Sequence, residues 1–384
     1  MTTTATVPNV AGTNPLKGLL EYGQSPWMDY IRRDLLTGGG LQKMIEEDGL
    51  RGQTSNPSIF EKAITESQLY ADILSSPDAK KLDAKGVYEK IAIRDVQDAC
   101  DIFKPIYQST RRRDGYVSLE VSPYLANDTK GTLEEARRLW KAVNRENLMV
   151  KVPGTPEGVP AIRQLLADGL NINITLLFAQ SAYEQVAEAF FAALEARVLK
   201  KQDVSHSASV ASFFVSRIDT LVDSKIETML QTAGGEKKEL LSSLEGKVAI
   251  ANAKLTYEKY QELYSSSRWK ALAAKGAQTQ RLLWASTSTK NKKYRDVLYV
   301  EELIGAETVD TIPPATFDAF RSHGRLRSSL TEDVPGAAKT MEDLGKAGIS
   351  MKEVTDKLLA DGVKLFADAF KTLLDATGKS AGVR

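Results

Sequence analysis

Short apolar runs alternate with longer segments of helical periodicity along most of this chain. The apolar runs have the length and the flanking turn residues of β-strands. Eight segments fit this description: Trp27 to Ile31, Leu50 to Thr54, Tyr116 to Val121, Leu148 to Val152, Leu170 to Thr175, His206 to Phe213, Leu282 to Ser286 and Thr308 to Ile312. Strands separated by helices are typical of βαβ units, and eight such units predict an α/β fold, a closed (β/α)8 TIM barrel.

Three segments are longer than a minimal barrel requires. Residues 60–113 are too long for one crossover and predict three helices. Residues 224–280 predict a helical insertion before the seventh strand, a lid or an interface, and residues 325–384 predict a helical C-terminal extension. Because α/β barrels routinely exceed about 250 residues, we expect residues 1–384 to form a single barrel domain.

The composition limits the partners and the location of the protein. The chain has 51 basic and 50 acidic residues, a balance that favours neither nucleic acid nor an anionic membrane. No apolar run is long enough to span a membrane, and Met1 to Pro8 lack the basic head and apolar centre of a signal peptide. Cys100 is the only cysteine, which fits a reducing compartment, and we expect a cytoplasmic protein.

The two histidines of the chain, His206 and His323, are far apart in sequence. This spacing disfavours a histidine-based metal site, and it equally disfavours a cysteine–histidine nucleophile pair. We therefore expect chemistry carried by lysine, carboxylates and hydroxyl groups, without a metal.

One lysine lies in an otherwise apolar strand. Lys151 follows Leu148-Met149-Val150 and precedes Val152, after which Pro153-Gly154 ends the strand. Partial desolvation at the strand's end would favour the neutral amine, which can attack a ketone and form a Schiff base. The alternative is a structural lysine whose stem crosses the barrel wall and whose head reaches water.

Polar residues also mark the ends of the other predicted strands. They are Asp29, Asn56, Glu120, Asn173, Thr175, Ser212, Arg217, Ser286 and Lys290. Active sites of such barrels lie at the C-terminal ends of the strands, so we expect these side chains to converge on Lys151. Arg217 and Lys290 suit a phosphate group, and the period of two residues in a strand puts Asn173 and Thr175 on one face.

Each of these residues has a structural alternative. Asp29 could cap the helix that follows it, and Asn56 could be an ordinary turn residue before Pro57. Asn173 could satisfy backbone groups in the barrel, and Arg217 could pair with Asp219 or Asp223. The convergence of all of them on consecutive strand ends favours the functional interpretation.

At these residues the sequence resembles the transaldolases, the Schiff-base enzymes of the pentose phosphate pathway. Thr54-Ser55-Asn56-Pro57-Ser58 is similar to a signature that follows the family's second strand. Val150-Lys151-Val152-Pro153 is similar to its lysine signature, and Asn171 to Phe178 to its asparagine–threonine strand. The resemblance covers roughly Gln24 to His323, and the length and long insertion resemble the larger bacterial subgroup.

The resemblance implies a role for each site residue. It implies that Lys151 forms the Schiff base, that Asp29 is the acid/base aspartate, and that Glu120 works through a water beside Thr175. It further implies that Asn56, Asn173 and Ser212 hold substrate hydroxyls and that Arg217 and Ser286 bind phosphate. Whether Lys290 replaces the family's second phosphate-binding arginine stays open, because the loop after the seventh strand is longer than in most relatives.

The implied reaction transfers a dihydroxyacetone unit from a ketose phosphate to an aldose phosphate, with no metal or organic cofactor. Sugar phosphates are then the expected partners, and the protein could be a monomer or a homodimer. One alternative is a simple Schiff-base aldolase acting on fructose 6-phosphate, although such relatives carry glutamine at the position of Glu120. Others are a non-catalytic sugar-phosphate-binding barrel and a structural barrel whose insertion binds a partner.

Overall fold

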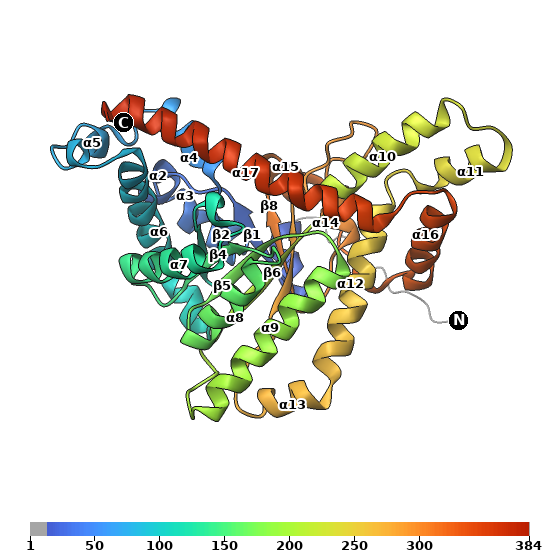
Figure 1. Ribbon diagram of the computed structural model, residues 1–384, viewed down its shortest axis with the longest axis horizontal. Coiled ribbons are helices and arrows are strands. Elements are labelled where there is room, and N and C mark those ends of the chain that lie inside the picture. The colour runs from blue at the N-terminus through green and yellow to red at the C-terminus, as the bar shows by residue number, and fades with distance from the viewer. Residues whose placement is uncertain (1–13, 384) are drawn as a thin grey trace.

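The eight strands form a closed parallel barrel in which each pairs with its sequence neighbours and β8 pairs with β1 (Figure 1). The computed structural model describes residues 14–383, so the segment Met1 to Pro8, which we expect not to be a signal peptide, lies outside it, as does Arg384. The strands are β1 (Gln24–Asp29), β2 (Gly52–Thr54), β3 (Tyr116–Glu120), β4 (Leu148–Pro153), β5 (Ile172–Leu177), β6 (Ser209–Phe214), β7 (Arg281–Ala285) and β8 (Thr308–Ile312). The predicted (β/α)8 fold is confirmed.

Helices follow the strands and cover the outside of the barrel. Within the described residues they are α1 (Pro15–Gly18), α2 (Arg33–Thr37), α3 (Gly40–Glu47), α4 (Pro57–Thr65), α5 (Ala71–Leu74), α6 (Ala84–Ser109), α7 (Thr129–Val143), α8 (Gly158–Asp168), α9 (Gln180–Leu199), α10 (Ser216–Leu230), α11 (Gly235–Leu244), α12 (Val248–Ser265), α13 (Ser267–Ala273), α14 (Leu298–Glu302), α15 (Pro314–His323), α16 (Val334–Lys346) and α17 (Met351–Ala381). Short 3₁₀ helices are η1 (Leu19–Tyr22), η2 (Ala79–Lys81), η3 (Pro123–Leu125) and η4 (Ser329–Thr331).

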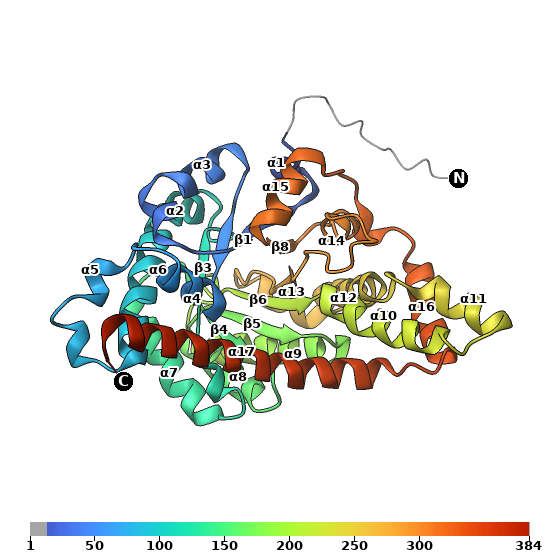
Figure 2. The same cartoon turned by 90° about the horizontal axis from the view of Figure 1, so that it is seen from above.

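The long segments contain the helices that the sequence predicts. Residues 60–113 hold most of α4 together with α5 and α6, and residues 224–280 hold the end of α10 together with α11, α12 and α13. Figure 2 shows α10, α11 and α16 gathered at the end of the molecule opposite α5 and α7. That residues 1–384 form one domain stays a prediction.

Several strand boundaries differ from the prediction. β1 begins at Gln24 and ends at Asp29, earlier than the apolar run that starts at Trp27, because Gln24, Ser25 and Pro26 pair in register with β8. β5 continues past Thr175 to Leu177 through an irregularity in its pairing with β6. Polar residues in β1 and a bulge in β5 carry no apolar signal, so hydrophobic pattern alone misplaced these ends.

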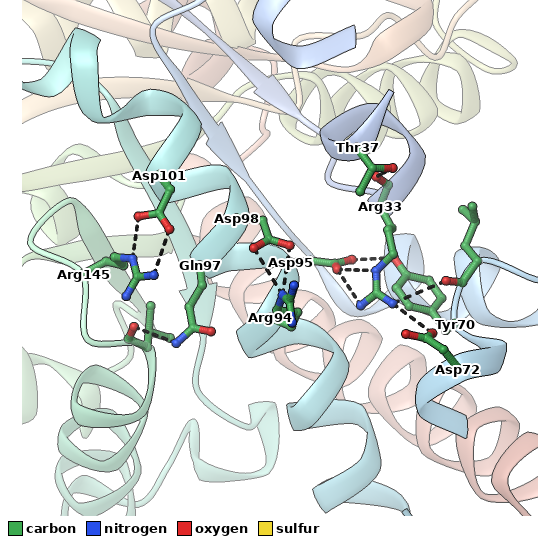
Figure 3. A network of polar contacts seen from close by, with 12 residues as sticks. Arg33, Thr37, Tyr70, Asp72, Arg94, Asp95, Gln97, Asp98, Asp101 and Arg145 are labelled. Carbon is green, nitrogen blue, oxygen red and sulfur yellow. Dashed lines mark hydrogen bonds and ion pairs between the residues drawn. The ribbon is translucent and has the colours of Figure 1, made fainter. Parts of the chain in front are cut away.

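The longest of the early helices, α6, is attached to the barrel by polar contacts as well as by its apolar face. Figure 3 shows the Arg33 guanidinium between two carboxylates. It donates to buried Asp95 at 3.0 Å and to Asp72 at 3.2 Å, while the Tyr70 hydroxyl donates to Asp95 at 2.6 Å. A second pair, Arg145 with Asp101, links the far end of α6 to the segment before β4. Asp95 is thus a paired internal charge that fixes α6 relative to α2.

The last helix, α17, lies across the barrel from the side of α10 and α16 to the side of α5 and α6 (Figure 1). It packs along α4 and α6 and also touches β5. Gly362 permits this approach, because a Cβ at that position would lie 3.0 Å from a methyl group of Leu176. The C-terminal extension therefore returns to the barrel's open end, where the strand ends lie.

The opposite, N-terminal end of the barrel is closed by a buried ion pair. The Arg281 guanidinium at the start of β7 donates to the Asp114 carboxylate at 2.7 Å, to the Ser25 hydroxyl at 2.7 Å and to the carbonyl oxygen of Arg113 at 2.7 Å. The Ser25 hydroxyl in turn donates to the second carboxylate oxygen of Asp114. These contacts tie β1, β7 and the segment before β3 together inside the barrel.

Two further findings concern residues 14–383 only. None of the helices in that range is both long and apolar enough to cross a membrane. No group of three or more histidine, cysteine or acidic side chains in that range is arranged to hold a metal ion.

Candidate active site

A cavity of about 560 Å³ opens at the C-terminal ends of the strands. Most of the predicted site residues line it, namely Asp29, Asn56, Lys151, Thr175, Ser212, Arg217, Ser286 and Lys290. Glu120 and Asn173 lie behind its wall. The barrel thus brings together, at the ends of its strands, residues up to 261 positions apart in sequence.

Lys151 is buried in the wall of this cavity, with 7% of its surface exposed. Its Nζ atom donates to Glu120 Oε1 at 3.0 Å and to the carbonyl oxygen of Ser55 at 3.1 Å. The register of β3 and β4 places Glu120 directly beside Lys151, so the pairing of these strands sets the contact. The structural alternative required a lysine head that reaches water. The Lys151 head is instead buried and hydrogen-bonded inside the site.

Glu120 is the carboxylate partner of the lysine. Burial raises the pKa of Glu120 from its ordinary value, and the neighbouring charge of Asp29 raises it further, while Lys151 opposes the shift. A carboxylate in such surroundings holds a proton more readily than one in water. Glu120 is therefore suited to accept and return a proton beside the Lys151 amine.

A second, much smaller cavity of about 20 Å³ is lined by Glu120, Lys151 and Thr175 together with apolar side chains such as Leu176 and Phe366. A volume of roughly 10–15 Å³ is enough for one water molecule. The Thr175 hydroxyl is buried and has no hydrogen-bond partner among the described residues. The residues that carry the carboxylate, the amine and the hydroxyl group thus line one small space together with apolar neighbours.

Asp29 and Asn56 lie on the β1–β2 side of the cavity. The Asp29 carboxylate accepts a hydrogen bond of 2.7 Å from the Thr54 hydroxyl. It caps no helix, because α2 begins four residues later behind Arg32. Asn56 does act as the N-cap of α4, accepting from the Ile59 amide at 3.2 Å, and it lines the cavity as well. For Asn56 the structural and the functional interpretations hold together.

Asn173 lies beneath the cavity rather than in its wall. It is fully buried, and its side-chain nitrogen donates to the Ser118 hydroxyl at 3.0 Å. Its side-chain oxygen accepts from the Ser212 hydroxyl at 2.7 Å. Asn173 therefore holds Ser212, which does line the cavity, in a fixed orientation.

Arg217 and Lys290 form the positive side of the cavity. Within residues 14–383, no carboxylate lies within 4 Å of either side chain's nitrogens. The carboxylates of Asp219 and Asp223 accept instead from Tyr299 and Tyr294, so neither neutralises Arg217. Desolvation lowers the pKa of Lys290, and the charge of Arg217 adds to that effect. Two cations without acidic partners suit an anionic ligand.

Two residues of the site have a left-handed backbone although neither is glycine. They are Leu176, with a φ of 62°, and Ser286, with a φ of 61°. Leu176 follows Thr175 in the irregular part of β5, and Ser286 begins the loop that carries Lys290. Such conformations cost free energy and gather at functional sites, because the surrounding structure holds them.

The sequence missed one wall of the cavity. It consists of α17 residues between Leu365 and Thr372, among which Phe366 is aromatic and Asp368 is charged. The insertion at 224–280, predicted as a possible lid, contributes no residue to this wall. The four Lys–Asp pairs spaced by four residues along α17 indicate a stable helix. They do not indicate what it covers, since that depends on its tertiary placement.

Comparison with known proteins identifies the family of the chain. The transaldolase/fructose-6-phosphate aldolase family matches residues 26–377. The transaldolase of Trichodesmium erythraeum is 46% identical over 95% of this chain and 97% of its own length. Transaldolase 2 of Nostoc punctiforme is 45% identical over 95% and 97%, and the transaldolase of Thiobacillus denitrificans is 45% identical over 95% and 100%. With this coverage, the chain belongs to the transaldolase/fructose-6-phosphate aldolase family.

Proposed function

We propose that this protein is a transaldolase that moves a dihydroxyacetone unit between sugar phosphates through a Schiff base on Lys151. The observation that carries the proposal is the buried lysine, held by Glu120 at 3.0 Å in the wall of the strand-end cavity. Unlike the arginine of the buried ion pair at the other end of the barrel, this lysine lines the cavity and can become a nucleophile. The similarity to proteins named transaldolase over 95% of the chain supports the same activity.

The first half of the reaction forms the Schiff base. Glu120 takes a proton from the Lys151 ammonium, and the neutral amine attacks the C2 carbonyl carbon of the ketose phosphate. The resulting carbinolamine loses its hydroxyl group as water, with the proton supplied by Glu120 through a water beside Thr175. The cavity of about 20 Å³ that these three residues help to line supports this arrangement.

The second half breaks and remakes a carbon–carbon bond. Asp29 removes the proton of the C4 hydroxyl, the C3–C4 bond breaks, and its electron pair flows into the iminium to give an enamine. An aldose phosphate leaves with the new C4 aldehyde. The enamine then attacks the aldehyde carbon of a second aldose phosphate, Asp29 returns the proton, and water releases the new ketose from Lys151.

The positive side of the cavity has a matching task. Arg217 and Lys290, with the hydroxyl groups of Ser286 and Ser288, would hold the phosphate of the sugar. Binding energy from this remote group can align C2 with Lys151 and the C4 hydroxyl with Asp29. Asn56 and Ser212 would contact the sugar hydroxyls, with Asn173 orienting Ser212. We also propose a cytoplasmic location, which fits the single, buried cysteine.

The decisive experiment traps the intermediate and then tests transfer. Borohydride with fructose 6-phosphate should add a three-carbon unit to the protein, and peptide mapping should find it on Lys151. Adding erythrose 4-phosphate before the borohydride should discharge the enamine and yield sedoheptulose 7-phosphate. Release of free dihydroxyacetone without transfer would identify the simple aldolase instead. No adduct in the wild type, or an adduct on another lysine, would contradict the proposal.

A further inference from the structure

The two cations of the proposed phosphate site lie on separate elements, and their like charges repel each other. Arg217 is in the first turn of α10, and Lys290 is in the loop between β7 and α14. Neither has a carboxylate within 4 Å among residues 14–383. The positive charge of Arg217 therefore acts on Lys290 more strongly than the opposing charge of Asp29, and it favours movement of the loop away from α10.

Helix α10 holds this loop at its first turn. The Ser216 amide donates to the carbonyl oxygen of Ser286 at 3.2 Å, and the hydroxyl groups of the two serines lie 2.9 Å apart. Ser286 is the residue whose φ of 61° starts the loop. This contact fixes where the loop leaves β7, but Lys290 follows four residues later and is exposed.

The same helix holds the loop again, two turns further on. The Tyr294 hydroxyl donates to Asp223 Oδ2 at 2.7 Å, and the Gly246 amide donates to Asp223 Oδ1 at 3.1 Å. The Tyr294 ring lies so close over Gly246 that a Cβ there would be 2.7 Å from the Tyr294 Cζ. Gly246, with a φ of 68°, belongs to the 224–280 insertion, so the insertion forms part of the seat for Tyr294.

A tight turn joins Tyr294 to Lys290. The Tyr294 amide donates to the carbonyl oxygen of Asn291 at 3.1 Å, and the Lys293 amide donates to the Asn291 side chain at 3.0 Å. Asn291 follows Lys290 directly. Because the turn is fixed at Tyr294, the position of that ring also sets where the backbone of Lys290 lies.

We propose that Tyr294 and Asp223 are positioning residues that hold Lys290 beside Arg217, so that the two cations are ready for the phosphate of the substrate. The proposal rests on the proposed function of the cavity. It gives the 224–280 insertion a task, because Gly246 seats the tyrosine. Without the Tyr294–Asp223 contact, repulsion between the cations would displace the loop, and the phosphate would have to restore its position on binding.

The test removes the Tyr294 hydroxyl alone. Tyr294→Phe should raise KM for fructose 6-phosphate about fivefold with kcat little changed, the effect of one hydrogen bond. kcat/KM for unphosphorylated fructose, which does not use Lys290, should stay within about twofold of the wild type. The matched control is Tyr257→Phe, because its hydroxyl donates at 2.9 Å from α12 to the carbonyl oxygen of Ala306, below the barrel. The control should alter neither donor's kinetics.

A double-mutant cycle separates positioning from a general loss of stability. Lys290→Ala should weaken fructose 6-phosphate, and Tyr294→Phe should add almost nothing in that background. Equal fold-changes of Tyr294→Phe in both backgrounds, or equal losses on both donors, would overturn the proposal. If Arg217→Ala fails to distinguish the two donors, the phosphate site itself is wrong and this inference falls with it. If Arg217→Ala distinguishes them and Tyr294→Phe does not, only this inference falls.

Discussion

The barrel contains a buried ion pair near each end, and the two pairs have different cations. At the C-terminal end Lys151 and Glu120 lie 3.0 Å apart, with 8% and 9% of their side chains exposed. At the N-terminal end Arg281 and Asp114 lie 2.7 Å apart, with 5% and 10% exposed. Distance and burial are therefore similar. What differs is the chemistry of the cation and what lies next to it.

Arginine keeps its proton at any physiological pH, and its planar group can satisfy several fixed acceptors at once. Arg281 donates to a carboxylate, a hydroxyl and a carbonyl group, and lines no part of the strand-end cavity. Lysine can lose its proton and become a nucleophile, and Lys151 lines the cavity beside a small water-sized space. The comparison teaches that the choice of cation separates a stabilising pair from a reactive one.

We call Lys151–Glu120, at the C-terminal end, the upper pair and Arg281–Asp114, at the N-terminal end, the lower pair. The largest effect should follow from giving the upper pair the arginine of the lower pair. Lys151→Arg keeps the charge beside Glu120 but removes the amine, so we expect transfer to fall roughly 10⁴-fold or more, as for loss of a nucleophile. The melting temperature should change little. Coupled assays of glyceraldehyde 3-phosphate release measure the rate.

The control is the reciprocal exchange. Arg281→Lys should keep most of the activity and lose stability, because one ammonium cannot serve three fixed acceptors as well as a guanidinium. Substantial activity in Lys151→Arg would show that Lys151 is not the nucleophile.

Variants that lack one of the two carboxylates of the site should be slow at different steps of the reaction. Glu120→Gln should slow borohydride-trappable adduct formation, whereas Asp29→Asn should form the adduct and cleave the C3–C4 bond slowly, each by about 10²–10⁴-fold. Because burial raises the pKa of Glu120, the acidic limb of the wild-type pH profile for adduct formation should lie above the ordinary glutamate range. That limb should vanish in Glu120→Gln. Normal trapping in Glu120→Gln with none in Asp29→Asn would reverse the two roles.

The lower pair should matter for stability instead of rate. Arg281→Met leaves Asp114 buried without its cation, so unfolding in urea should show a loss of about 3–5 kcal/mol. The activity per folded molecule should be unchanged, because the site is at the other end of the barrel. Lys151→Met should cost less stability, since the raised pKa of Glu120 lets it take up a proton. A variant of Arg281 that stays fully stable would remove the distinction between the pairs.

The sequence predicted the upper pair and missed the lower one for a physical reason. Lys151 is conspicuous as a lone charge in an apolar strand, and strand-end reasoning also found Glu120 in the neighbouring strand. Arg281 and Asp114 lie at strand starts, 167 residues apart, where polar residues are ordinary. Their contact exists only because the sheet closes, and closure is a tertiary property that no local pattern records.

The same distinction explains the remaining successes and failures. Period and strand length predicted the barrel and the residue order around it, because these signals are local. The wall formed by Phe366 and its neighbours on α17 was not predictable, because the path of a C-terminal helix depends on packing such as that of Gly362 on Leu176. The position of Asn173 behind the cavity wall was not predictable either, because it depends on contacts with Ser118 and Ser212 in other strands.

The smallest effect concerns a buried carboxyl group with no cation beside it. Asp310 in β8 is fully buried, and it accepts from the Thr287 hydroxyl at 2.9 Å with one oxygen while the other has no partner among the described residues. Burial raises the pKa of Asp310 to about 8. The folded protein thus holds this proton between about pH 4 and pH 8, where the unfolded chain has lost it, so stability falls as the pH rises through that window.

Asp310→Asn removes this proton from the balance and keeps the shape of the side chain. From pH 6 to pH 8 the variant should lose about 2 kcal/mol less unfolding free energy than the wild type, as measured in urea at each pH. Asp356→Asn is the control, because that carboxylate is 62% exposed on α17, where it pairs with Lys352. Parallel stability curves for wild type and Asp310→Asn would mean that Asp310 is charged when buried. A buried carboxylate in this fold would then need no cation, and the pairing of Asp114 with Arg281 would lose its explanation.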